Sequence, residues 1–236
     1  MINDSLIILA AGLSSRMKKS VSSKNLSKRS IEQANSRDKG LIGIDKNGRP
    51  LIHYLLINAK IAGFKVIYLV IGQNSDSFKS YFDENKYDGL DIEFAVQYLE
   101  KNKLKPSGTA DALFQAITQF PILKSSNFCV CNSDNLYSAK ALRSIRSTSF
   151  SNAFISYDKS FLNFSSAKVS SFSILKLNKN GYLVNILEKP TTKDFDLFKD
   201  NGGKIRVSMN LFKFNGSVFY DYLKNFSEKN KYIEEN

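Results

Sequence analysis

Histidine and cysteine are scarce in this chain of 236 residues, which contains one histidine and two cysteines. A single Cys-X-Cys pair supplies neither a disulfide framework nor a four-ligand zinc site. Cys129 and Cys131 would point to the same face of a strand, and we interpret them as small buried hydrophobic residues rather than redox groups. His53 lies in an apolar helical stretch, which favours a packing role over a Ser-His-Asp mechanism.

Long apolar runs are also absent. None approaches the roughly 20 residues that a membrane span needs, and the N-terminus begins with a strand-like segment rather than a signal peptide. We therefore expect a cytoplasmic protein without a membrane partner. Hydrophobic residues make up 42% of the chain and charged residues 24%, which argues against disorder. The length suits one α/β domain with its own core.

Acidic residues are outnumbered: 34 Lys plus Arg stand against 22 Asp plus Glu, which gives a net charge of +12. Such an excess is typical of proteins that bind nucleic acids, acidic membranes or phosphorylated small molecules. The alternative is a general enrichment in Lys without a functional meaning. The basic residues are dispersed, and Phe and Tyr follow the periodicity of core positions. We therefore expect no nucleic-acid partner.

Apolar runs alternate with helical patterns in the first 150 residues. The runs predict strands over 6–9, 66–71, 92–96 and 128–131, and the patterns predict helices over 50–63 and 110–119. This alternation implies crossover connections and a sheet covered on both faces. The predicted fold is a three-layer α/β/α sandwich with a Rossmann-like, mixed but mainly parallel sheet.

The pattern changes after residue 150. Strands are predicted over 153–157, 172–177, 183–187 and 206–214, with a hairpin turn at Asn180-Gly181 and a helix over 217–226. A polar, basic segment over 18–38 predicts a long loop with a short helix around 30–34.

Six segments, taken in order, resemble the motifs of nucleotidyltransferases that join a nucleoside triphosphate to a phosphorylated small molecule. The first is a small-residue loop after the first strand, where backbone amides can approach a phosphate closely. The segments are LAAGLSSRM (9–17), KGLI (39–42) with RPLI (49–52), GTADA (108–112), NSDN (132–135), EKP (188–190) and VSMNLF (207–212). The resemblance covers nearly the whole chain and implies the nucleotide-diphospho-sugar transferase fold.

The resemblance also implies the roles of the charged residues. Arg16 would hold the β- and γ-phosphates, Lys39 the α-phosphate or the incoming phosphate, and Asp134 an Mg²⁺ ion. Each has a simpler alternative, because both cations belong to a very basic chain and Asp134 would suit an ordinary turn. Asp38 stands where the family has proline before its lysine, so Lys18 or Lys24 could substitute for Lys39.

The remaining candidates divide between two ligands. By resemblance, Glu188 would bind sugar hydroxyls and Lys189 the sugar phosphate, although these two could simply pair with each other. Asn210 would line the sugar site or serve as a second metal ligand, for which Asp221 is the alternative. The residues expected against the nucleotide are Leu9, Ala10, Ala11, Gly12, Gln97, Gly108 and Thr109.

The implied function is Mg²⁺-dependent transfer of a nucleoside monophosphate from a nucleoside triphosphate to a sugar 1-phosphate. We expect one domain over 1–236, with a nucleotide-binding part over about 1–150 and a sugar-binding part over about 151–236. Three alternatives stay open: cytidylyl transfer to phosphocholine or a polyol phosphate, a nucleotide-binding homologue with reduced chemistry, and a piece of a longer enzyme. The base, the sugar, homo-oligomerisation and the role of the basic loop are also open.

Overall fold

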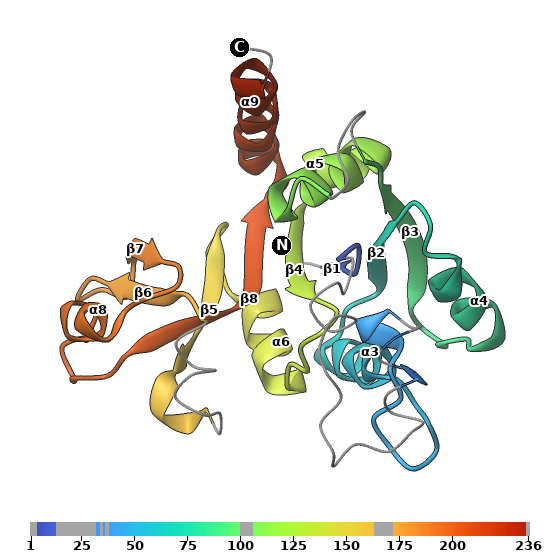
Figure 1. The fold of residues 1–236 in the computed structure, drawn as a ribbon, viewed down its shortest axis with the longest axis horizontal. Coiled ribbons are helices and arrows are strands. Elements are labelled where there is room, and N and C mark those ends of the chain that lie inside the picture. Colours follow the sequence, from blue (N-terminus) through green and yellow to red (C-terminus); the bar gives the residue numbers. More distant parts are fainter. Residues whose placement is uncertain are drawn as a thin grey trace. The chain divides into compact units, whose positions relative to one another are not determined.

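The computed structural model describes residues 4–12, 32–33, 35, 38–99, 106–162 and 172–234. The chain forms two compact units, the larger comprising Met1–Ala153 with Phe212–Asn236 and the smaller Phe154–Leu211. Figure 1 labels the elements of both. Within the described residues, no helix is both long enough and apolar enough to cross a membrane.

A parallel sheet forms the centre of the larger unit. Its strands are β1 (Ser5–Leu9), β2 (Val66–Gly72), β3 (Asp91–Gln97) and β4 (Asn127–Asn132), in the order β3-β2-β1-β4. In register, Leu6 of β1 lies opposite Ile67 on one side and Cys129 on the other. The end of β8 (Arg206–Asn215) adds an antiparallel strand beside β4. The sheet is therefore mixed but mainly parallel, as predicted.

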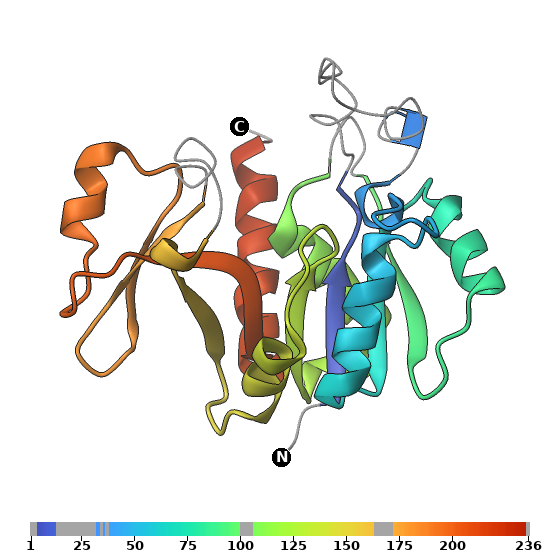
Figure 2. The same cartoon turned by 90° about the horizontal axis from the view of Figure 1, so that it is seen from below.

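Helices cover both faces of this sheet. They are α3 (Leu51–Ala62), α4 (Asp76–Glu84), α5 (Thr109–Gln119), α6 (Ala139–Ser147) and α9 (Gly216–Glu234). Figures 1 and 2 show α5 and α9 on one face and α3 and α6 on the other. Phe94 of β3 contacts Phe82 of α4, whereas the next residue, Ala95, packs under α5. Consequently α4 shares the face of α3, and the three-layer α/β/α arrangement is confirmed.

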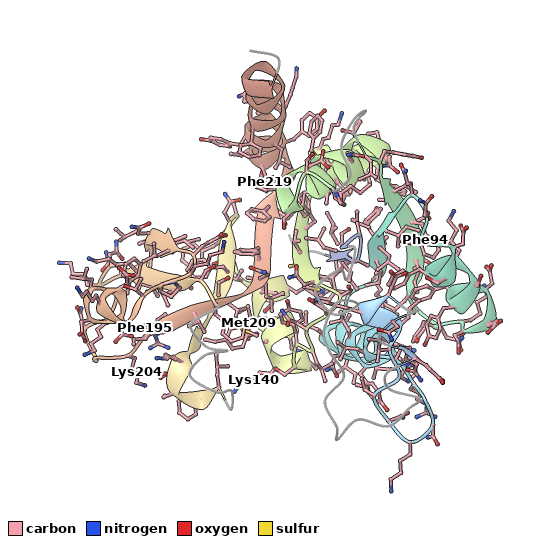
Figure 3. The ribbon with its side chains drawn as sticks, in the orientation of Figure 1. Phe94, Lys140, Phe195, Lys204, Met209 and Phe219 are labelled. Atoms are coloured by element: carbon pink, nitrogen blue, oxygen red, sulfur yellow. The ribbon has the colours of Figure 1, made fainter. Side chains whose placement is uncertain are left out.

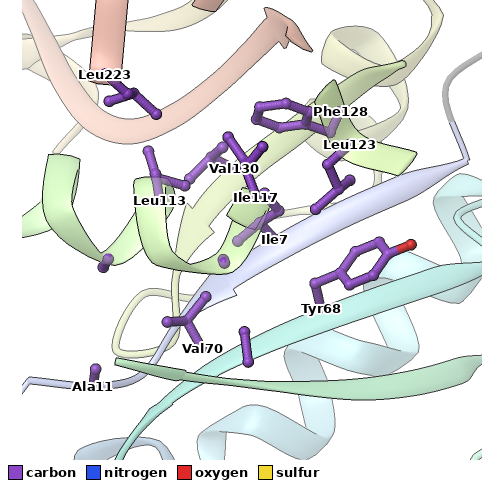
Figure 4. Close-up of a cluster of buried hydrophobic side chains, with 13 residues drawn as sticks. Ile7, Ala11, Tyr68, Val70, Leu113, Ile117, Leu123, Phe128, Val130 and Leu223 are labelled. Atoms are coloured by element: carbon purple, nitrogen blue, oxygen red, sulfur yellow. The ribbon is translucent and has the colours of Figure 1, made fainter. Parts of the chain in front are cut away.

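The core beneath α5 and α9 combines aliphatic and aromatic side chains. Ile7, Ile117 and Phe128 are fully buried there, as Figure 4 shows. Phe219 of α9, labelled in Figure 3, stacks on Phe214 with ring centroids 3.9 Å apart. Cys129 and Cys131 lie in the same strand, are buried and form no disulfide, which confirms the packing interpretation. Burial raises the pKa of the Cys131 thiol, so this thiol stays protonated at neutral pH.

The smaller unit is built from shorter elements. These are β5 (Ala153–Asp158), the 3₁₀ turn η3 (Lys159–Phe161), β6 (Ile174–Leu177), β7 (Leu183–Leu187), α8 (Thr192–Leu197) and the first part of β8. The predicted hairpin is present, because β6 and β7 pair antiparallel. Ile174, Phe198 and Val207 form the buried core of this unit.

Candidate functional site

A cavity of about 370 Å³ lies at the carboxyl ends of β1, β3 and β4 in the larger unit. Ligands bind at this edge in open α/β sheets, and the volume is in the range of small-molecule sites. Among the predicted site residues, the cavity brings together Leu9, Ala10, Ala11, Gly12, Lys39, Gln97, Gly108, Thr109 and Asp134. Arg16 and its neighbours Lys18 and Lys24 lie outside the described residues, so their roles stay predictions.

The end of β1 forms one wall of the cavity. The amide of Ala10 donates to the carbonyl of Val70 at 2.7 Å, and the carbonyl of Leu9 accepts from the amide of Ser133 at 3.0 Å. These bonds hold the chain up to Ala10. Within the described residues, the next two amides, those of Ala11 and Gly12, donate no hydrogen bond. Backbone amides at such a position can donate to an anionic or carbonyl oxygen.

Tyr137 fixes the turn that carries Asp134. Its buried hydroxyl accepts from the amide of Asn132 at 3.3 Å and from the side-chain amide of Asn135 at 3.1 Å. Its carbonyl accepts from the side chain of Asn58 in α3 at 2.8 Å. The turn is thus tied to β4 and to α3, and the Asp134 carboxylate is held at the cavity without being buried.

Lys39 reaches the same cavity from the 3₁₀ turn η1 (Lys39–Leu41) and lies beside Asp134. Its Nζ is 3.1 Å from Asp134 Oδ2, and the two side chains are 41% and 40% exposed. Asp38, which replaces the family's proline, accepts a hydrogen bond from Ser77 of α4 at 2.8 Å. The turn is therefore held by Asp38 rather than by proline, and it places Lys39 in the cavity.

Gly40 packs closely on its neighbours in this turn. A Cβ at this position would lie 3.3 Å from the ring of Phe78 and 3.4 Å from Cβ of Ser133. A side chain at this position would therefore require the Phe78 ring or the turn to shift by a few tenths of an ångström.

Gly108 and Gln97 form the wall beside α5. Gly108 has φ +98° and ψ −169°, a conformation open essentially only to glycine. It directs the N-terminus of α5, at Thr109, to the cavity, where unpaired helix amides favour negative charge. Gln97 is 3% exposed, and its side-chain nitrogen donates to Asp111 Oδ2 at 2.6 Å and to the Gly108 carbonyl at 3.2 Å.

The other predicted residues belong to the smaller unit. Glu188 and Lys189 directly follow β7, and Asn210 lies in β8. Lys189 has φ 51° and Asn210 has φ 56°, the only positive values among the described residues other than glycine. Such conformations cost free energy and concentrate at functional sites.

The amino-acid sequence agrees with this geometry. A sequence model of the family described as "Nucleotidyl transferase" matches residues 34–235. The chain belongs to the nucleotidyl transferase family. It is accordingly an enzyme of the nucleotidyltransferase class, as predicted. The matched range contains Lys39, Asp134 and Lys189, whereas the loop after β1 precedes it. No curated protein matches the chain.

Several residues that line the cavity of this nucleotidyl transferase were not predicted as site residues. They are Gly40, Pro106, Ala112, Asn132 and Ser133. All except Pro106 stand within the quoted motifs, so the motifs themselves were the available signal for those four; Pro106 lies two residues before the GTADA motif. Asp111 also stands in such a motif, and its contact with Gln97 depends on tertiary structure.

A magnesium ion would fit the nucleotidyl transferase cavity if substrate phosphates supply some of its ligands. Among the described residues, no group of three or more His, Cys, Asp or Glu side chains could hold a metal by itself. Among the lining residues that the structure describes, Asp134 is the one that carries a carboxylate. Magnesium typically combines one or two carboxylates with substrate phosphates and water. The donor set therefore suits a metal that arrives with a nucleotide.

Proposed function

We propose that this nucleotidyl transferase is a cytoplasmic, Mg²⁺-dependent enzyme that transfers a nucleoside monophosphate to a sugar 1-phosphate. Its product would be a nucleoside-diphosphate sugar, an activated donor for surface polysaccharide. The observation that carries this proposal is the pair formed by Lys39 and Asp134, 3.1 Å apart at the carboxyl edge of the sheet. A cation for phosphate and a carboxylate for a metal are what phosphoryl transfer needs in one place.

In the reaction, an oxygen of the sugar 1-phosphate attacks the α-phosphorus of the nucleoside triphosphate. The bond from the α-phosphorus to the bridging oxygen breaks, and the electron pair leaves with pyrophosphate. Lys39 would bind a phosphate oxygen on which negative charge accumulates, and Arg16 would hold the leaving phosphates. Asp134 would hold Mg²⁺, which when bound supplies positive charge to the phosphate oxygens. For both residues to act, their ion pair must open.

The walls of the cavity would bind the rest of the nucleotide. The amides of Ala11 and Gly12 would donate hydrogen bonds to it, and Gln97 offers a buried amide side chain. Thr109 begins α5, whose N-terminal amides favour a negatively charged ligand.

The acceptor would use residues of the smaller unit. Glu188 would accept hydrogen bonds from sugar hydroxyls, and Lys189 would pair with the sugar phosphate. The positive φ values of Lys189 and Asn210 support a role in binding, because strained backbone conformations concentrate at functional sites.

Pyrophosphate release tests this proposal. The purified chain with Mg²⁺ is offered each common nucleoside triphosphate together with sugar 1-phosphates, with phosphocholine and with polyol phosphates. Release that requires a sugar 1-phosphate supports the proposal. Release with CTP and phosphocholine or a polyol phosphate alone would replace it with cytidylyl transfer. Nucleotide binding without any release from a folded protein would indicate a homologue that lacks the chemistry.

A further inference from the structure

Asn58 is a polar residue in the middle of the mostly apolar helix α3. Leu55, Leu56 and Ala59 around it are fully buried, whereas Asn58 itself is partly buried. Its side-chain nitrogen donates to the main-chain carbonyl of Tyr137 at 2.8 Å, across 79 positions of the sequence. A carbonyl that is removed from water needs a donor, so this bond explains why an amide side chain stands among apolar ones.

Tyr137 connects this bond to the turn that carries Asp134. Its hydroxyl accepts from the amide of Asn132, on one side of Asp134, and from the side-chain amide of Asn135, on the other side. Tyr137 is 2% exposed, so the ring has little freedom to move. Tyr137 therefore closes the turn around Asp134, and Asn58 attaches Tyr137 to α3.

The same helix also holds the turn that carries Lys39. The amide of Leu51, the first residue of α3, donates to the carbonyl of Ile42, and the amide of Ile42 donates to the carbonyl of Lys39, both at 3.3 Å. The attachments at Leu51 and Asn58 are about two helical turns apart. Helix α3 is therefore a common support for the cation and the carboxylate that meet in the cavity.

We infer that Asn58 and Tyr137 are positioning residues that hold the Asp134 carboxylate within reach of a metal ion bound to the nucleotide phosphates. This inference rests on the proposed function, in which the cavity holds Mg²⁺ together with a nucleotide. Asp134 is 40% exposed, so the turn, rather than packing around its own side chain, determines where the carboxylate lies. A metal with one protein carboxylate takes its other ligands from phosphate and water, and its binding then depends on that placement.

Two substitutions remove these hydrogen bonds without changing a residue that lines the cavity. Asn58→Leu keeps the approximate size of the side chain and suits a helix, but it removes the donor. Tyr137→Phe removes only the hydroxyl. Asn85→Leu is the matched control, because the Asn85 side chain also donates to a main-chain carbonyl, that of Tyr81, at 2.8 Å, but at the end of α4 and away from both turns.

The gain in nucleotide affinity that Mg²⁺ provides tests the inference. The full chain is titrated calorimetrically with UTP, CTP, GTP and ATP, each with Mg²⁺ and with EDTA, and the best-bound nucleotide is then used for the variants. We expect Mg²⁺ to raise the affinity of the wild type, and Asn58→Leu and Tyr137→Phe each to lose about three- to tenfold of this gain. The affinity in EDTA should be unchanged, whereas a general defect of the cavity would lower it as well.

A second pair of variants shows that the gain belongs to Asp134. Asp134→Asn should abolish the gain, whereas Asp76→Asn, at an exposed carboxylate in the first turn of α4, should keep it. Because Asn58 and Tyr137 act on one turn, the double variant should lose less than the product of the two single losses.

The outcomes separate the inference from the proposed function. If one of the two positioning variants does not fold, the other one decides. A wild-type gain in either folded variant, or an equal loss in Asn85→Leu, would overturn the inference and leave the proposed function intact. A gain that Asp134→Asn does not change would remove Asp134 as the metal ligand, and the inference with it. Failure of every nucleotide to bind the folded wild type would overturn the proposed function.

Discussion

Strands of the two units differ sharply in burial. In the larger unit, Leu6, Ile7 and Ile8 of β1 are fully buried, whereas in the smaller unit Leu183 and Val184 of β7 are 40% and 60% exposed. The first pattern is that of a strand inside a sheet covered on both faces. The second is that of an edge strand, because β7 pairs only with β6 among the described strands.

The units also hold their candidate residues differently. In the larger unit, hydrogen bonds hold the turn that carries Asp134 and the side chain of Gln97. In the smaller unit, Lys189 and Asn210 are distinguished by backbone conformation. The difference teaches that one part of the enzyme provides a pre-formed cavity, whereas the other stores local strain at the residues proposed to bind the acceptor.

Truncation of the two cores should give the largest effects. Phe128→Ala in the larger unit removes a fully buried ring and should lower the free energy of unfolding by about 3–5 kcal/mol. Ile174→Ala in the smaller unit should cost about 2–4 kcal/mol and act locally. Hydrogen exchange should show fast amides confined to 154–211 in the second variant. Uniform loss of protection in both variants would contradict the separation into two units.

Asp134→Asn should lower turnover by about 10²–10³, because it removes a charge that would hold the metal at the reacting phosphates. The thermal unfolding midpoint should change little, since the carboxylate is 40% exposed. Pyrophosphate release measures the first quantity, and Asp76→Asn serves as the control. Normal turnover in Asp134→Asn would remove this residue from the proposed mechanism.

Lys189→Gly should separate strain from binding in the smaller unit. Glycine adopts a positive φ without cost, so stability should be unchanged or rise by up to about 1 kcal/mol. The KM for the sugar phosphate should rise about tenfold with the loss of a charged partner. Lys179→Gly is the control, because Lys179 is exposed in the same unit and has no positive φ. An unchanged KM in Lys189→Gly would leave the strain without a functional explanation.

Lys39→Met should strengthen metal binding, although the same change removes a cation that is proposed to assist catalysis. Without nucleotide, Lys39 pairs with Asp134, so its removal frees the carboxylate. Exposed pairs contribute about 0.2–1 kcal/mol, which predicts an increase of up to about fivefold in affinity for Mn²⁺ as a probe of the Mg²⁺ site. Paramagnetic resonance of free Mn²⁺ measures it. Weaker metal binding in this variant would show that the ion pair does not compete with the metal.

The smallest effect concerns His53, the only histidine in the chain. Burial, reinforced by Arg49, lowers its pKa below the usual 6.5, so protonation favours the unfolded chain. Its contribution to stability is therefore complete above pH 6.5 and declines as the pH falls below that value. We expect a slightly lower unfolding midpoint at pH 5.5 than at pH 7.5. His53→Gln, which keeps a partner for Tyr87, should reduce the difference between the unfolding midpoints at the two pH values. If this difference is the same in the variant, the pH dependence comes from other groups.

Much of the fold could be predicted from local pattern. The strands over 66–71 and 183–187 and the helix after Pro50 follow directly from apolar runs and from helix stop signals such as Gly63, whose φ is 95°. Helices α4 and α6 were not predicted, because each buries only two apolar side chains among polar ones. Phe78 and Phe82, four residues apart after Ser75, were the missed signal for α4.

The candidate site was predictable only in part. Motif positions such as Lys39 and Asp134 converge on the cavity, but their ion pair joins residues 95 apart in sequence. The orientation of Gln97 depends on Asp111 and Gln115, which approach it only when α5 packs beside β3. Neither contact has a local sequence pattern, because both depend on tertiary packing.

Photo-crosslinking with a base-azido nucleoside triphosphate tests most directly whether the cavity of the larger unit binds the nucleotide. The full chain is irradiated with Mg²⁺ and the probe, digested, and analysed by mass spectrometry, with excess unlabelled nucleotide as competitor. The account predicts label in peptides containing 9–12, 97 or 108–112, removed by the competitor. Competed label confined to 154–211, with none at the cavity, would contradict it.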